Sequence, residues 1–142
     1  MNNIDFKIER LLLKSGSILN NTRLDDLKRY DLTPSQSEAV LYFAENDKKN
    51  IKDLAEHLKI THQAARKIVE KLKEKDIFAT EVSADDKRSV WVVLTDKGMQ
   101  LLGELQKCGT SVSELLLSGL NEDEKKHLLE CLQKIEKNIL SR

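Results

Sequence analysis

Apolar residues recur along most of this chain at spacings of three, four and seven, with polar residues between them. This spacing is typical of helices that have one apolar face. It predicts helices over residues 4–29, from Pro34 to the polar run 45–50, over 51–58, over 62–75, from Thr95 through 116, and from Asn121 through 139.

The beginnings of these helices carry capping residues. Thr33 can accept a hydrogen bond from the first turn, Pro34 presets the first helical backbone angle, and Gln36 stands three residues after the cap. Ala39, Val40 and Phe43 form the predicted inner face of that helix. The residues that can cap the later helices are Asn50, Thr61, Thr95 and Asn121. We expect strain or kinking at Ser15-Gly16-Ser17, Gly103 and Gly109, because glycine weakens a helix interior.

The helices at 51–58 and 62–75 are joined only by Lys59-Ile60. Helices joined by so short a link cross steeply, as in a helix-turn-helix. The four-residue steps between Ala64, Ile68 and Leu72, with Val69 beside them, predict the buried face of the second helix.

Between residues 77 and 94, apolar residues recur at every second position instead of every third or fourth. Residues 77–82 and 89–94 are rich in β-branched and aromatic side chains, and Val90, Val92 and Leu94 fall on one face. The polar loop 83–88 separates the two runs. A hairpin that follows a helix-turn-helix is a wing. The predicted fold is therefore mainly α with a small β-hairpin wing, a winged helix-turn-helix flanked by terminal helices.

Composition narrows the class of protein. The 142 residues carry 24 basic and 24 acidic side chains, so any affinity for nucleic acid must come from local arrangement of charge. No apolar run is long enough to span a membrane, and the beginning of the chain lacks a signal-peptide core. A cytoplasmic protein with reduced thiols is expected.

Catalytic and metal-binding motifs are missing from the sequence. We find no phosphate loop, nucleophile elbow or zinc signature, and therefore expect neither an enzyme nor a cofactor. Cys108 and Cys131 lie on apolar stripes and are expected to be small buried core residues. His57, His62 and His127 have no obvious partners at metal-ligand spacing, although a metal-sensing site between subunits stays open as an alternative.

The strongest candidate for function is the helix at 61–75. From Lys59 to Lys75 there are six cations and two anions, an excess of four positive charges in a neutral chain. The amides of the helix start and the Thr61 hydroxyl can bind phosphate, and Gln63 and Arg66 can read base edges in a major groove. The candidate DNA-binding residues of this segment are Thr61, His62, Gln63, Arg66, Lys67 and Lys71. The alternative is a solvated helix face with internal ion pairs.

The wing loop offers a second contact. An arginine such as Arg88 suits the concentrated negative potential of a narrow minor groove. Asp86 would repel phosphate if it were free, so its expected role is to orient an arginine. Asp86, Lys87 and Arg88 are the candidate residues here, and an ordinary polar hairpin loop is the alternative.

These segments together resemble the MarR family of winged-helix transcriptional regulators over nearly the whole chain. The residues that carry the resemblance are Leu32-Thr33-Pro34-Ser35-Gln36, Ile51-Lys52-Asp53-Leu54-Ala55-Glu56-His57-Leu58, Thr61 to Leu72, Asp86-Lys87-Arg88 and Val93-Leu94-Thr95-Asp96-Lys97-Gly98. The wing followed by Leu-Thr-x-Lys-Gly is the most specific of these motifs.

The resemblance implies a homodimer on double-stranded DNA. Residues 1–32 and 99–142 would form the helical dimerisation region, and 33–98 the winged helix-turn-helix. Thr61, His62, Gln63, Arg66 and Lys67 would meet the major groove, and Lys87 and Arg88 the minor groove. Family members often bind a small phenolic or other lipophilic effector, so such an effector is implied here too.

The chain departs from the family pattern at three places. Asp76 stands where a glycine is usual before the wing, Thr80 lies near the usual position of a basic residue, and the cysteine of the redox-sensing branch is missing near the beginning of the chain. The leading hypothesis is a dimeric regulator, most simply a repressor, on a pseudo-palindromic operator. The rival is a winged-helix protein-interaction module without DNA binding.

Overall fold

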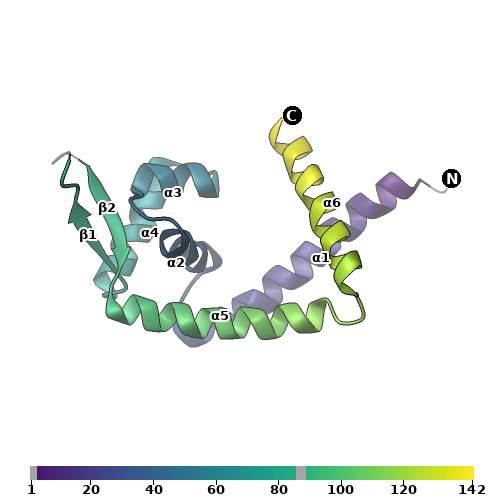
Figure 1. Cartoon of the computed structure of the whole chain (residues 1–142), viewed down its shortest axis with the longest axis horizontal. Coiled ribbons are helices and arrows are strands. Elements are labelled where there is room, and N and C mark those ends of the chain that lie inside the picture. The colour runs from purple at the N-terminus through teal and green to yellow at the C-terminus, as the bar shows by residue number, and fades with distance from the viewer. Residues whose placement is uncertain (1–2, 86–88) are drawn as a thin grey trace. The chain divides into compact units, whose positions relative to one another are not determined.

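The computed structural model describes residues 3–85 and 89–142, and it confirms the predicted fold class. The chain divides into two compact units, Met1–Leu105 and Gln106–Arg142. The elements are α1 (Ile4–Leu27), the 3-10 turn η1 (Lys28–Tyr30), α2 (Pro34–Glu45), α3 (Ile51–Leu58), α4 (His62–Glu74), β1 (Phe78–Val82), β2 (Val90–Leu94), α5 (Asp96–Leu116) and α6 (Glu122–Leu140). Figure 1 shows the β1–β2 hairpin rising from the start of α5.

The predicted helix beginnings are confirmed. Thr33 and Gln36 form a capping box at α2, with the Gln36 amide 3.1 Å from the Thr33 hydroxyl and the Thr33 amide 3.0 Å from the Gln36 side chain. Asn50 and Asn121 start α3 and α6 with the same reciprocal pattern. Each of these boxes satisfies two amides that no helical carbonyl can reach.

The expected end of the first helix is wrong. The first helix ends at Leu27 rather than at residue 29, because the chain tightens there into η1. The helix α1 continues through Ser15-Gly16-Ser17, and α5 continues through Gly103 and Gly109, so neither helix ends at a glycine, and the expected strain or kinking stays a prediction. Glycine lowers helix stability but keeps its amide and carbonyl, so the ladder of backbone hydrogen bonds continues through it.

The hydrophobic core is formed mainly by the elements of the winged helix. Its residues come from the end of α1, the connection to α2, α2, α3, α4, the hairpin with Ile77 before it, and the first half of α5. The largest fully buried side chains include Leu54, Leu72, Val40 and Val69. Two edge-on ring contacts, Phe43 with Phe78 and Phe43 with Tyr42, continue this core from the strand to α2. This packing fixes the position of α4, the helix that carries most of the candidate DNA-binding residues.

The unit Gln106–Arg142 consists of the second half of α5 and of α6, and none of its residues is buried. Cys108 and Cys131 are free thiols that are half-buried, which corrects the expectation of buried core residues. Among the described residues, no helix is both long and apolar enough to cross a membrane.

Candidate nucleic-acid interface

The turn between α3 and α4 places the start of α4 at the surface. Lys59 adopts the left-handed conformation with φ of 58° and ends α3. The amide of Ile60 then donates to the carbonyl of Ala55 at 3.1 Å. Thr61 caps α4 by accepting from the amide of Ala64 at 3.1 Å. The first amides of α4 precede any helical acceptor, so they present the positive end of the helix dipole to solvent.

The buried face of α4 differs from the predicted one by one position. Ala65, Val69 and Leu72 are buried, whereas Ala64 and Ile68 are only half-buried. This helix has apolar residues on two adjacent stripes, and packing against α2, α3 and β1 selects the stripe centred on Val69. The correction leaves the candidate residues outside the core. Thr61, His62, Gln63, Arg66, Lys67 and Lys71 are all exposed.

The cations on this exposed face are available to a ligand. Neither Arg66, Lys67 nor Lys71 forms an ion pair with any carboxylate in the described part of the chain. This observation weighs against a solvated face held by internal ion pairs. Within the described part of the chain, a polar side-chain contact on α4 joins Arg66 to His62, where the guanidinium Nη2 lies 3.3 Å from the imidazole Nε2. The imidazole can accept from the guanidinium only in its neutral form.

Lys75 contributes less to this face than its charge suggests. Its Nζ lies 3.2 Å from Asp31 Oδ2, and it also donates to the carbonyl of Asp31. The carbonyl of Lys75 in turn accepts from Lys97 Nζ at 3.0 Å. Lys75 therefore connects the end of α4 to the end of η1 and to α5, which is a structural role.

The hairpin is an antiparallel pair in which Phe78 stands opposite Leu94 and Val82 opposite Val90. Val92 is buried, as expected for the inner face, and Thr80 on β1 is exposed. Thr80 thus presents a neutral hydroxyl where the family usually has a basic residue. Asp86, Lys87 and Arg88 lie outside the described residues, and their role in DNA binding stays a prediction.

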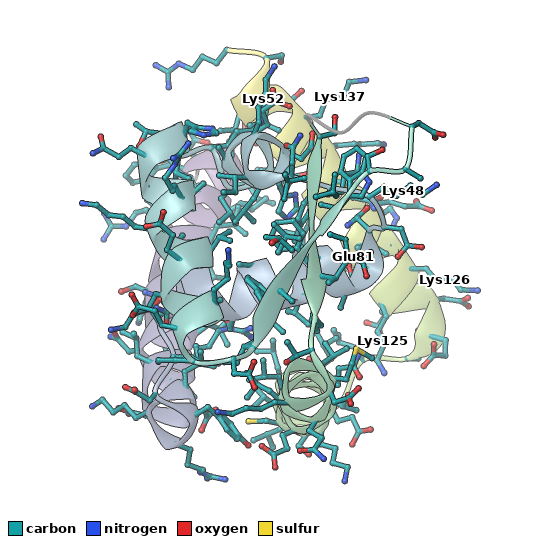
Figure 2. All side chains as sticks on the ribbon, turned by 90° about the vertical axis from the view of Figure 1, so that its left-hand side faces the viewer. Lys48, Lys52, Glu81, Lys125, Lys126 and Lys137 are labelled. Carbon is teal, nitrogen blue, oxygen red and sulfur yellow. The ribbon has the colours of Figure 1, made fainter. Side chains whose placement is uncertain are left out.

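The loop between α2 and α3 joins the hairpin, which the sequence did not indicate. The amide of Val92 donates to the carbonyl of Lys49 at 2.9 Å. Lys48 and Lys52 are exposed on either side of this contact, and both are labelled in Figure 2 together with Glu81 of β1. The cluster of Lys48, Lys49 and Lys52 in the sequence was the available sign of positive charge in this segment. Its place beside the wing depends on a contact between residues 43 positions apart.

The junction between the hairpin and α5 explains the Leu-Thr-x-Lys-Gly motif. The Thr95 hydroxyl accepts from the amide of Gly98 at 3.0 Å and lies 2.5 Å from the carbonyl oxygen of Asp76. The amide of Thr95 donates to the carbonyl of Ile77 at 3.0 Å. Asp76 takes the left-handed conformation, with φ of 62°. Aspartate tolerates this conformation better than most residues, so it closes the end of α4 in place of the usual glycine.

The histidines outside α4 have local partners. His57 stacks on Tyr42 with ring centroids 4.5 Å apart. Burial raises the pKa of Tyr42, and the carboxylates of Asp53 and Glu56 raise it further. His127 Nε2 lies 3.9 Å from Cys131 Sγ on α6. Within residues 3–85 and 89–142, no three His, Cys, Asp or Glu side chains come together as metal ligands.

Comparison with known proteins agrees with this geometry. The sequence model of the MarR family matches residues 30–89, which include α2, the helix-turn-helix and β1 and end before β2. This segment belongs to the MarR family. The HTH-type transcriptional repressor NicR of Pseudomonas putida is 36% identical over 70 residues, which are 49% of this chain and 44% of that protein. The match therefore spans less than half of the curated relative.

Solved structures extend the likeness to the whole chain. The structure described as an S. aureus MepR–DNA complex has a TM-score of 0.83 at 20% identity, covering 96% of this chain and 99% of that one. AbsC, a MarR family transcriptional regulator from Streptomyces coelicolor, has a TM-score of 0.85 at 16% identity, covering 100% of this chain and 98% of that one. At these identities the likeness establishes the fold.

Proposed function

We propose that this chain is a sequence-specific, DNA-binding transcriptional regulator, most simply a repressor. The observation that carries the proposal is the exposed face of α4, where Arg66, Lys67 and Lys71 have no described carboxylate partner. Gln63 and Arg66 are side chains suited to adenine and guanine edges in a major groove. NicR is named a transcriptional repressor, and the MepR structure is described as a DNA complex, which supports the same class of ligand here.

The proposed active form is a homodimer on a pseudo-palindromic operator. The support is apolar surface outside the winged helix. Exposed large apolar residues on α1 are Ile4, Phe6, Ile8, Leu11, Leu12, Leu13, Ile18, Leu19 and Leu24, and those of the C-terminal unit are Leu115, Leu116, Leu128, Leu129, Leu132, Ile139 and Leu140. Large exposed apolar surfaces commonly mark sites of protein–protein interaction. We assign residues 1–32 and 99–142 to dimerisation and 33–98 to DNA binding.

The energetics of DNA recognition also favour a dimer. One recognition helix and one wing make few base contacts, and a mismatched base pair typically costs only about 1–3 kcal/mol. Two-fold symmetry doubles the contacts and requires half-sites about one helical turn apart. A small phenolic or lipophilic effector would then release the operator if it binds one separation of the two recognition helices more tightly than the other.

Selection of bound duplexes from a random pool at moderate salt tests the proposal. We expect enrichment of a pseudo-palindrome with half-sites about one turn apart. Affinity for that duplex should fall steeply as salt rises, because phosphate contacts release counterions. The rival, a protein-interaction module, is favoured by the neutral net charge and by the exposed Thr80. A folded dimer that enriches no duplex would support the rival.

The variant Arg88→Ala separates wing contacts from dimerisation. We expect it to weaken operator binding by about tenfold to a hundredfold, as loss of a groove-reading arginine does. Sedimentation should give the same dimer as for the wild type. Lys107→Gln, an exposed substitution on α5, is the control and should bind as the wild type does. Wild-type affinity in Arg88→Ala would show that the assignment of the wing is wrong.

A further inference from the structure

Among the described residues, helix α1 is buried against the winged helix near its end. Leu27 is its one buried residue, and Arg23 and Asp26 are half-buried, whereas most of the preceding turns are exposed. The connection from α1 to α2 is short and contains η1 and the left-handed Asp31. The direction in which α1 leaves the winged helix therefore depends on contacts made by a single turn.

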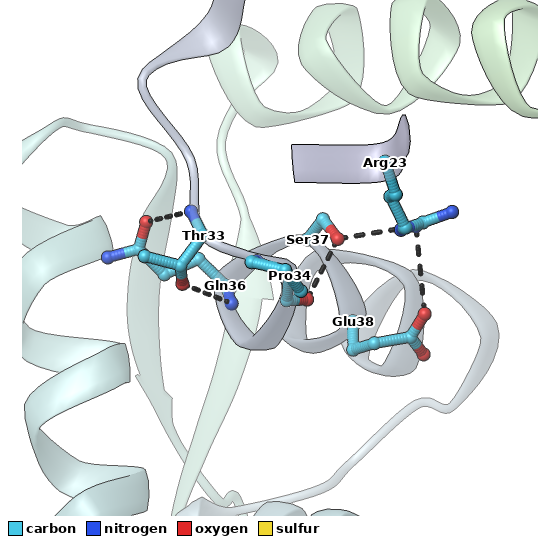
Figure 3. Close-up of polar contacts among 6 residues, drawn as sticks. All are labelled: Arg23, Thr33, Pro34, Gln36, Ser37 and Glu38. Carbon is cyan, nitrogen blue, oxygen red and sulfur yellow. Dashed lines mark hydrogen bonds and ion pairs between the residues drawn. The ribbon is translucent and has the colours of Figure 1, made fainter. Parts of the chain in front are cut away.

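Arg23 makes the polar contact between this turn and α2. Its Nη2 donates to Ser37 Oγ at 3.3 Å and lies 3.7 Å from Glu38 Oε1, as Figure 3 shows. Ser37 is fully buried, and its hydroxyl donates to the carbonyl of Pro34 at 2.9 Å. One guanidinium nitrogen thus contacts both a buried hydroxyl and a half-exposed carboxylate in the first turns of α2.

These acceptors are held in place independently of Arg23. The capping box of Thr33 and Gln36 fixes the start of α2, and the Ser37 hydroxyl keeps the Pro34 carbonyl as a partner when Arg23 is removed. Ala39 and Val40, farther along α2, belong to the core that also contains α4. Loss of the guanidinium would therefore free α1 more than it would unfold the winged helix.

We propose that Arg23, through Ser37 and Glu38, is a positioning residue that sets the direction of α1 relative to the recognition helix α4. The consequence for DNA rests on the proposed function. In a dimer joined through α1, this direction determines the separation of the two recognition helices and therefore the half-site spacing that the protein accepts. Each added base pair lengthens the site by about 3.4 Å and rotates one half-site by about a tenth of a turn.

The first experiment measures affinity for operators whose half-site spacing is longer or shorter by one base pair. We expect the wild type to prefer its best spacing at least tenfold, and Arg23→Met to prefer it threefold or less. Arg23→Lys should recover part of the preference, because an ammonium can still pair with Glu38. Arg29→Met removes the same charge from an exposed residue of η1 and should keep the wild-type preference. Equal preferences in Arg23→Met and the wild type would overturn the proposal.

The second experiment needs no DNA. Spin labels at Ser17→Cys on α1 and Glu70→Cys on α4, in full-length chains carrying Cys108→Ser and Cys131→Ser, report the distance between the two helices. Dilution with unlabelled chains keeps the measurement within one subunit. We expect a broader or displaced distance distribution in Arg23→Met and an unchanged one in Arg29→Met. An unchanged distribution in Arg23→Met would refute the positioning role. A broadened distribution in a protein that binds no duplex would instead refute the proposed function alone.

Discussion

Gly98 lies so close to Ile77 that a Cβ atom at Gly98 would stand 2.3 Å from the Ile77 carbonyl oxygen. That carbonyl also accepts from the amide of Thr95, so it cannot move without breaking the junction between the hairpin and α5. The glycine of the Leu-Thr-x-Lys-Gly motif is therefore required by the close approach of two backbones.

Gly98→Ala should lower the free energy of unfolding by about 2 kcal/mol or more, because the new methyl group meets backbone that cannot yield easily. Gly103→Ala is the matched control in the same helix. Nothing lies within 4 Å of a Cβ atom there, so we expect a gain of about 0.5–1 kcal/mol from higher helix propensity. Urea unfolding measures both changes. Equal stabilities of the two variants would contradict the close contact.

Asp76 offers a second test of the same junction. Its φ of 62° lies in the left-handed region, which costs most non-glycine residues about 1–2 kcal/mol. Asp76→Ala should be destabilised by about 1 kcal/mol, whereas Asp76→Gly should be at least as stable as the wild type. Thermal unfolding of Asp76→Ala, Asp76→Gly and the wild type measures these differences in stability. A more stable alanine variant would mean that the conformation at residue 76 is not left-handed.

The raised pKa of Tyr42 predicts how the free energy of unfolding changes at alkaline pH. Burial, together with Asp53 and Glu56, raises its pKa above the ordinary value of 10.0. The folded state then holds the phenolic proton more tightly than the unfolded state does. The resulting stabilisation is complete below pH 10.0 and disappears as the pH rises through the higher, folded-state pKa. Denaturant titrations above pH 10 should show a shallower loss of stability in Tyr42→Phe. Identical slopes for variant and wild type would exclude this linkage.

Lys67 tests the phosphate contacts of α4. Lys67→Gln should weaken binding similarly for the operator and for unrelated duplexes. It should also reduce the slope of log affinity against log salt by about one, as expected for one lost phosphate contact. Lys107→Gln should leave the slope unchanged. Loss confined to the operator would mean that Lys67 reads a base instead.

Local sequence predicted the helices and their starts because these depend on neighbouring residues. Thr33, Gln36 and Asn50 form their caps with partners three positions away, and each was predicted. Alternation also placed Val92 on one face with Val90 and Leu94, and Val92 is buried whereas Val90 is exposed. The exposure of Gln63 and Arg66 followed from the same periodicity, so the surface position of these two candidate residues could be derived from the sequence.

The tertiary structure decided what local pattern leaves open. Ala64 and Ala65 begin two adjacent apolar stripes on α4, and only packing against neighbouring elements could select the stripe of Ala65. The contacts of Lys75 with Asp31 and of Lys49 with Val92 join residues more than forty positions apart, and periodicity carries no information about such pairs. The sequence by itself determined the elements and their apolar faces through short-range hydrogen bonding and helical spacing. Long-range packing decided which side chains each apolar face contacts. Those contacts depend on the shapes of segments that are remote in the chain and on the distances between them.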